Sequence, residues 1–240
     1  MRDQKQKISL SKAIEASLNN GHRILIDAEM LLYPESAPTA FVLSVLAQEE
    51  FAKAFLLYLV ETQCVPWDNN ICKALNDHSC KQLLCLLMDF LSPDVDKFLE
   101  RMRAIEEKHP ILPSHIIDTL NIIRHERVDK KPRADWISPE DAHLEPIVKK
   151  IADGDFDKLK QDALYVRIGR TGEVVSEPTR ITQGLAETEL EKAKRYSQVL
   201  YRHEGQIKGP IGLDYEKISA IFKVLFGLVS PEEFNKNWWL

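Results

Sequence analysis

The sequence is poor in glycine and cysteine, and it contains no low-complexity tract and no internal repeat of fixed period. Its 240 residues include only 9 glycines and 4 cysteines. The absence of biased tracts argues against a disordered or fibrous protein, and the absence of a repeat argues against a solenoid. With 44% hydrophobic and 29% charged residues, the composition is typical of a globular protein with a buried core.

The four cysteines lack the Cys-x-x-Cys spacing of many zinc and redox sites. On a helix, His78 and the cysteines of residues 72–85 would point in different directions, so they would not converge on one metal ion. We therefore expect neither a metal nor a cofactor. We interpret the thiols as reduced, buried side chains of a cytoplasmic protein.

An excess of positive charge is also missing, because the net charge is −5 at pH 7 and the isoelectric point is about 5.9. Such a chain offers no broad electrostatic platform for nucleic acid, although a small basic site for RNA is compatible with it. Residues 1–12 lack the apolar core of a signal peptide. Residues 40–60 are apolar enough to cross a bilayer, but Glu49, Glu50 and Lys53 would be costly there. We expect a soluble protein that contacts no membrane.

Apolar residues recur at helical spacing along most of the chain. The predicted helices span about residues 9–32, 36–63, 68–91, 182–204 and 214–228, and further helices begin at Ser92, Pro113 and Ser138. Between residues 165 and 176 the pattern alternates around a Thr-Gly turn, which predicts a short hairpin. The predicted fold class is all-α: a helical bundle with one short β-hairpin-like excursion near 165–176.

The helix predicted over 36–63 carries three charges among apolar residues. On a helical wheel Glu49, Glu50 and Lys53 share one side, and the helix is apolar nearly all round, which predicts a central position. A charge there needs a partner or a function, because an unpaired buried charge is too costly. The alternative interpretation is an ordinary Glu–Lys pair on a solvated face, worth about 0.3–0.5 kcal/mol.

Two further segments contribute polar groups. His78 and Lys81 are three residues apart and would be neighbours on a helix; they are either a solvated pair or a group that moves protons beside an acid. We expect the helices to bring Glu49 or Glu50 within reach of His78 or Lys81. Tyr165 follows the end of a helix, so it either points its phenol into the bundle or is a core aromatic with a backbone partner.

These segments together resemble a known family. The AbiV family of abortive-infection proteins, a branch of the HEPN-like all-α domains, has a helix with the pattern A-x-E-E-x-x-K-A, which residues 47–54 resemble. Residues 78–81 resemble its H-x-x-K, residues 160–166 its K/R-x-x-x-L-Y-V segment, and residues 21–32 its first helix. The four matches occur in order and cover about residues 8–200.

The resemblance implies a HEPN-like helical domain, which we assign to residues 1–204. The chain departs from the family in spacing, since the stretch between Lys81 and Tyr165 is longer than the family core needs, so we predict an insertion at 92–150. We also predict a C-terminal helical extension over 205–240 that packs on the bundle. Many HEPN relatives cut RNA without metal through an Arg-x(4–6)-His motif. The single numerical match, Arg103 and His109, is what chance predicts. The candidate catalytic residues are instead those of the matched segments: Glu49, Glu50, Lys53, His78, Lys81, Lys160 and Tyr165.

Two hypotheses of function follow. The first is a phage-defence effector that acts on RNA or the translation machinery, as a metal-independent endoribonuclease. The alternative is a non-catalytic helical module that binds a phage or host protein, which could also be the trigger. The basic run between Arg124 and Arg133 could contact phosphates, but interleaved acids favour a solvated helix end. We also expect a homodimer, because the apolar helices and Trp238-Trp239 expose more apolar surface than one small bundle covers.

Overall fold

The computed structural model describes residues 2–91, 113–137, 144–203, 206–208 and 222–223. The described part is mostly helical, which confirms the all-α class. The α-helices are α1 Arg2–Met30, α2 Ala37–Glu61, α3 Asn69–Ala74, α4 His78–Leu91, α6 Ser114–Ile122, α7 Pro146–Ala152, α8 Asp155–Asp162 and α9 Gln183–Tyr196. Two antiparallel hairpins pair β1 Arg167–Ile168 with β2 Val174–Ser176, and β3 Tyr201–His203 with β4 Gln206–Lys208.

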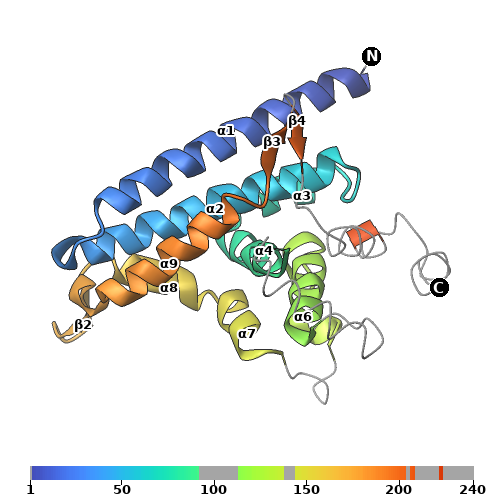
Figure 1. Ribbon diagram of the computed structural model, residues 1–240. Helices are drawn as coiled ribbons and strands as arrows, with labels where there is room; N and C mark the ends of the chain where they lie inside the picture. Colours follow the sequence, from blue (N-terminus) through green and yellow to red (C-terminus); the bar gives the residue numbers. More distant parts are fainter. Residues whose placement is uncertain (1, 92–112, 138–143, 204–205, 209–221, 224–240) are drawn as a thin grey trace, which may run out of the picture.

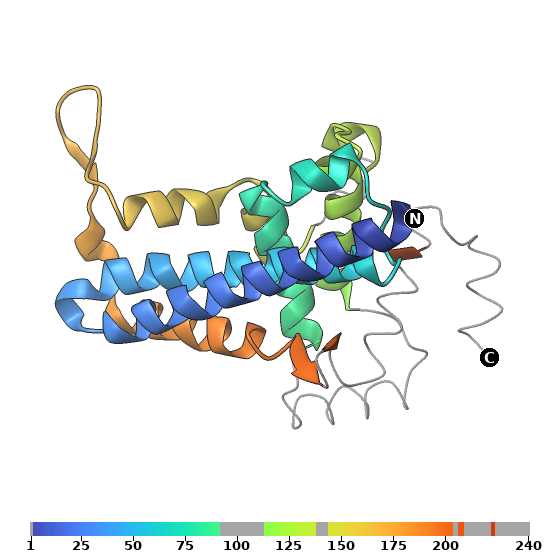
Figure 2. The same ribbon diagram turned by 90° about the horizontal axis from the view of Figure 1, so that it is seen from above.

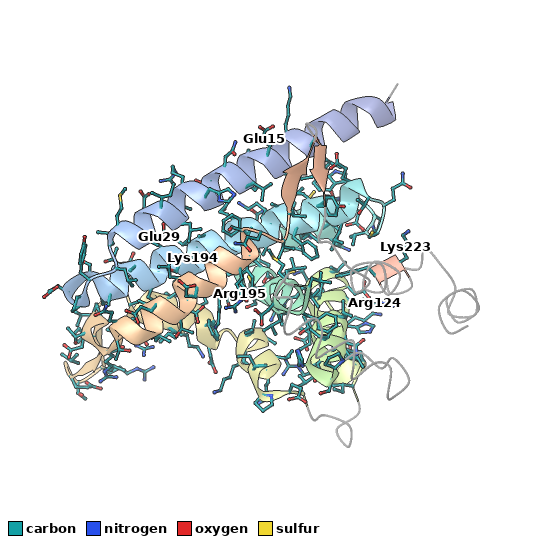
Figure 3. All side chains as sticks on the ribbon, in the orientation of Figure 1. Glu15, Glu29, Arg124, Lys194, Arg195 and Lys223 are labelled. Carbon is teal, nitrogen blue, oxygen red and sulfur yellow. The ribbon has the colours of Figure 1, made fainter. Side chains whose placement is uncertain are left out.

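Helix α2 lies at the centre of the bundle, as the sequence predicts. The long helix α1 runs beside it, and α9 packs along it as well (Figure 1). Gly21 lets α1 approach closely, because a Cβ there would come within 2.6 Å of the Phe51 ring. Glu29 of α1 and Lys194 of α9, labelled in Figure 3, form an ion pair at 3.1 Å. Helices α1, α2 and α9 therefore form one connected layer.

A second group of helices packs against α2 and carries much of the site described below. Helix α4 contacts α2, α6, α7 and α8, and α8 also contacts α2 directly. Ten of the fourteen residues of α4 are buried, so α4 is a core helix between α2 and α6. Figure 1 shows α8 and α7 next to each other on the side of α2 that also carries α4.

Three boundaries differ from the sequence prediction. The prediction of a single helix over 68–91 is wrong, because this segment forms two helices, α3 and α4. The Asp77 carboxylate accepts a hydrogen bond from the Cys80 backbone N–H and so caps the start of α4. The helix predicted to reach residue 204 ends at Tyr196, and β3 follows. Helix α6 starts after Pro113 as predicted but passes into a π-helical turn, Ile123–Val128, that the pattern did not indicate.

The predicted hairpin near 165–176 is confirmed. Arg167 pairs with Ser176 and Ile168 with Val174, and a register shift lies between the two pairs. Gly172 adopts φ +87°, which glycine tolerates best, and so allows the tight turn. The hairpin projects from one end of the bundle (Figure 2).

Other predictions fall on residues outside the described part of the chain: the helix starts at Ser92 and Ser138, most of the helix over 214–228, the Trp238-Trp239 tail and the domain boundary after residue 204. The insertion at 92–150 and the extension over 205–240 stay predictions. Within the described residues, no helix is both long enough and apolar enough to cross a membrane.

Candidate functional site

Three consecutive polar residues of α2 point to three different environments. Gln48 donates from its side-chain amide to the Glu189 backbone carbonyl of α9 at 2.8 Å and to the Glu189 carboxylate at 2.9 Å. Glu49 faces the other group of helices, and Glu50 pairs with Lys53 on α2 itself. The same short segment therefore joins α2 to α9 on one side and to α4 and α8 on the other.

The carboxylate of Glu49 is the centre of a polar cluster. Its Oε2 accepts a hydrogen bond from His78 Nδ1 at 2.6 Å and lies 2.9 Å from Lys81 Nζ. Its Oε1 accepts from Lys160 Nζ at 2.8 Å and from Gln82 Nε2 at 3.3 Å. The predicted contact of Glu49 on α2 with His78 and Lys81 on α4 is thus confirmed. Helix α8 adds a further partner, Lys160.

Most of this cluster is closed to solvent. The side chains of Glu49, Lys81 and Lys160 are 2%, 8% and 9% exposed. Burial alone would raise the pKa of Glu49, but the charges and hydrogen bonds of Lys81 and Lys160 outweigh it and lower the pKa below the ordinary value of 4.5. Glu49 is therefore an ionised carboxylate at neutral pH, held by two buried cations.

His78 is the exception, because its side chain is 49% exposed. An ionised carboxylate can only accept, so the 2.6 Å contact with Glu49 places a proton on His78 Nδ1. Lys160 Nζ also lies 3.2 Å from that nitrogen, but its nearer partners are the carboxylates of Glu49 and Asp157, at 2.8 and 3.0 Å. In the neutral ring, Nε2 then carries the free lone pair.

Three of the seven candidate residues do not join the cluster. Glu50 and Lys53 pair with each other at a partly exposed position on α2. Tyr165 is 66% exposed, and no hydrogen bond or ion pair connects it to Glu49 or to any other member of the cluster in the described part of the chain. The four residues that converge are Glu49, His78, Lys81 and Lys160.

Two members of the cluster were missed from the sequence. Asp157 lies three residues before Lys160 and contacts it at 3.0 Å, a spacing that helical periodicity could have indicated. For Gln82 the sequence held no comparable indication, because no residue spacing or motif around it predicts a contact with Glu49. Its Oε1 is buried without a hydrogen-bond partner among the described residues.

Cysteine chemistry and phosphate binding by the basic run find little support. The four cysteines, all within the described residues, form no disulfide, and burial raises the pKa of Cys80 to about 12. In the basic run, Arg133 pairs with Glu126 at 2.6 Å and with Asp153 at 3.3 Å, and Lys131 pairs with an acid as well. These pairs support the interpretation of the basic run as a solvated helix end.

No group of three or more His, Cys, Asp or Glu side chains in the described ranges is placed to hold a metal ion.

A comparison with protein families covers the elements that form this cluster. The model of HEPN-type AbiV domains matches residues 9–198, which include every member of the Glu49 cluster. The chain belongs to the AbiV family. Membership of the AbiV family indicates a role in abortive-infection phage defence. Searches of curated proteins and of solved structures gave no match to this chain. The Arg103 and His109 pair lies outside the described residues.

Proposed function

We propose that this AbiV-family chain is a cytoplasmic defence effector that cleaves RNA without a metal ion, with His78 as the group that moves protons. The observation that carries the proposal is the half-exposed imidazole of His78, oriented by a buried carboxylate at 2.6 Å. A carboxylate that holds one ring nitrogen fixes the tautomer, so that the other nitrogen can act as a general base.

The chemistry that this geometry supports is transfer of the RNA phosphoryl group to its own 2′ oxygen. His78 Nε2 removes the proton of a ribose 2′-hydroxyl, and that oxygen attacks the neighbouring phosphorus. The bond from phosphorus to the 5′ oxygen breaks, and the imidazolium returns the proton to this leaving oxygen. The products are a 2′,3′-cyclic phosphate and a 5′-hydroxyl.

The two lysines have a separate part in the proposal. Lys81 and Lys160 keep Glu49 ionised, and an ionised Glu49 stabilises the imidazolium that forms at His78. Lys160 Nζ lies 3.2 Å from Nδ1, on the Glu49 side of the ring, and so helps to hold the carboxylate and the imidazole together. Both lysines are more than nine-tenths buried, so we assign them to positioning.

The test is an RNA-cleavage assay with the purified full chain in the presence of EDTA. We expect cleavage of single-stranded RNA to cyclic-phosphate ends, and a loss of about 100-fold or more in His78→Gln. The matched control is His115→Gln, on α6 and outside the cluster, which should cleave as the wild type does. The proposal is wrong if the wild type does not cleave RNA, or if His78→Gln, folded by circular dichroism, cleaves equally well.

A second candidate is the non-catalytic module that binds a phage or host protein. The observation that favours it is that Glu49 and both lysines are buried and satisfy one another, as in a structural ion cluster, whereas Tyr165 is exposed. In infected cells this candidate predicts that His78→Gln retains phage resistance. The nuclease proposal predicts that resistance is lost while the amount of folded protein is unchanged.

A further inference from the structure

The reaction proposed above needs a positive charge that the Glu49 cluster does not supply. Transfer of the phosphoryl group passes through a phosphorane, whose negative charge is stabilised by a cation beside the phosphate. Lys81 and Lys160 are 8% and 9% exposed, and both hold Glu49, so neither reaches a substrate at the exposed edge of His78. The group that completes the site is therefore a cation that lies close to His78 and is open to solvent.

Two cations lie beside the residue that precedes His78. The π-helical turn Ile123–Val128 packs against α3 and α4 (Figure 2). At its end, Arg127 Nη1 and Lys130 Nζ lie 3.8 and 3.9 Å from Asp77 Oδ2. Asp77 caps the start of α4, and His78 is the first residue of that helix. The turn therefore brings positive charge to the end of α4 that carries the imidazole.

The two cations differ in their freedom to bind a ligand. Arg127 is 19% exposed and also donates a hydrogen bond to the Ala152 carbonyl, so it is a structural contact that offsets the charge of Asp77. Lys130 is 46% exposed, and the pair with Asp77 is the one ion pair that it forms among the described residues. An exposed pair at 3.9 Å is worth little. Lys130 can therefore exchange this contact for a phosphate oxygen.

The backbone of Lys130 gives a second, independent reason to assign a function to its side chain. Lys130 adopts φ +58°, the left-handed conformation, and the next backbone N–H, of Lys131, donates to the His125 carbonyl at 2.8 Å. Glycine takes this conformation without steric cost and commonly ends helices in this way. A lysine there strains its own turn, and strained residues of this kind cluster at functional sites.

We propose that Lys130 is the phosphate-binding residue of the site. Its ammonium group holds a non-bridging oxygen of the phosphate whose neighbouring 2′-hydroxyl is deprotonated by His78. Lys130 exchanges no proton and contributes charge and hydrogen bonds only. The inference rests on the proposed function and concerns this one side chain of the basic run, because the adjacent Lys131 pairs at 3.4 Å with Asp129 of its own segment.

The first experiment measures RNA cleavage and thermal stability of Lys130→Gly in the full chain. We expect cleavage to fall by about tenfold or more, because the cation at the phosphate is lost. The melting temperature should stay the same or rise by about 1–4 °C, because glycine relieves the left-handed backbone. Lys130→Arg should retain most of the activity, since a guanidinium group also binds phosphate.

The matched control is Lys131→Gln. It removes one positive charge from the neighbouring residue, whose side chain is 49% exposed against 46% for Lys130. This variant should cleave RNA as the wild type does. A melting temperature of Lys130→Gly that falls together with its activity would assign Lys130 a structural role and overturn the inference.

The second experiment measures binding without cleavage, in the His78→Gln background, by fluorescence anisotropy of a labelled single-stranded RNA at several salt concentrations. Adding Lys130→Gly should weaken binding by about threefold to tenfold and reduce the slope of log affinity against log salt by about 0.7, because one phosphate contact is lost. Adding Lys131→Gln should change neither quantity.

The outcomes separate this inference from the proposed function. If the wild type cleaves RNA, His78→Gln does not, and Lys130→Gly cleaves as the wild type does, the inference is wrong and the proposed function stands. If the wild type does not cleave RNA, the proposed function falls and the binding experiment decides on Lys130. Equal affinities with and without Lys130→Gly, or no binding of RNA at all, then overturn the inference.

Discussion

Glu49 and Glu50 are adjacent carboxylates on one helix, yet they have different surroundings. Glu49 is 2% exposed and has partners from α4 and α8, whereas Glu50 is 18% exposed and pairs with Lys53 one turn along the same helix. The side chain of Glu49 therefore holds three helices together, and that of Glu50 holds only its own helix. The difference shows that the structural role of a charged side chain depends more on the neighbouring helices packed around it than on the helix that carries it.

The largest expected effect comes from making the same change at both positions. Glu49→Gln leaves two buried lysines without their shared counter-charge, so we expect a loss of about 3–5 kcal/mol in the free energy of unfolding. Glu50→Gln breaks a partly exposed pair and should cost about 1 kcal/mol or less. Urea denaturation of both variants measures the difference. Equal losses in the two variants would remove the distinction between the two sites.

The lysines allow a second, smaller comparison. Lys160→Met removes one of the two buried cations around Glu49, and Lys81 stays in place, so we expect a loss of about 2–3 kcal/mol. Lys53→Met is the matched control on the exposed pair, with an expected loss of about 1 kcal/mol or less. The same denaturation assay applies. If Lys160→Met lost no more free energy of unfolding than Lys53→Met, the contact between Lys160 and Glu49 would not be what holds α8 against α2.

Acidification should narrow the gap between the wild type and Glu49→Gln. The pKa of Glu49 is lower in the folded chain than its ordinary value of 4.5. Its ionised form therefore stabilises the fold fully above about pH 4.5, and this contribution is lost as the pH falls through the folded pKa. Denaturation midpoints between pH 7 and pH 3 should converge for the two proteins. A difference that stays constant over this range would show that the charge of Glu49 is not what stabilises the cluster.

Tyr165→Phe should have the smallest effect. The side chain is 66% exposed, so removing its hydroxyl should change the free energy of unfolding by less than about 0.5 kcal/mol. RNA cleavage should also stay at the wild-type level, because the phenol lies outside the Glu49 cluster. A variant that is stable but inactive would bring Tyr165 back into the site.

Part of this arrangement follows from the sequence. The apolar residues all round α2 predict a central helix, and the cost of a buried charge predicts a partner for it on the next helix. Which of the two adjacent acids is buried could not be predicted, because the helical wheel puts Glu49 and Glu50 on one side. The decisive neighbour, Lys160, is 111 residues away, and its approach depends on how α7 and α8 pack against α4.

Other parts were hidden by competing local signals. The apolar pattern over 68–91 continues through the break between α3 and α4, and only the capping carboxylate of Asp77 marks the new start. Tyr165 was a candidate because it follows the end of a helix and lies in the segment that resembles K/R-x-x-x-L-Y-V, but the chain leaves α8 there and turns into the hairpin, which directs this segment outward. The position after a helix end therefore did not determine the direction of the phenol.

The most direct test is the position of the proton on the neutral ring of His78, measured by nitrogen NMR of the full chain. We expect a proton on Nδ1, hydrogen-bonded to the Glu49 carboxylate, and an unprotonated Nε2 that can accept a proton from RNA. A His78 ring with its proton on Nε2 would contradict the account, because the carboxylate would then not orient the ring and the nitrogen facing the substrate could not act as a base.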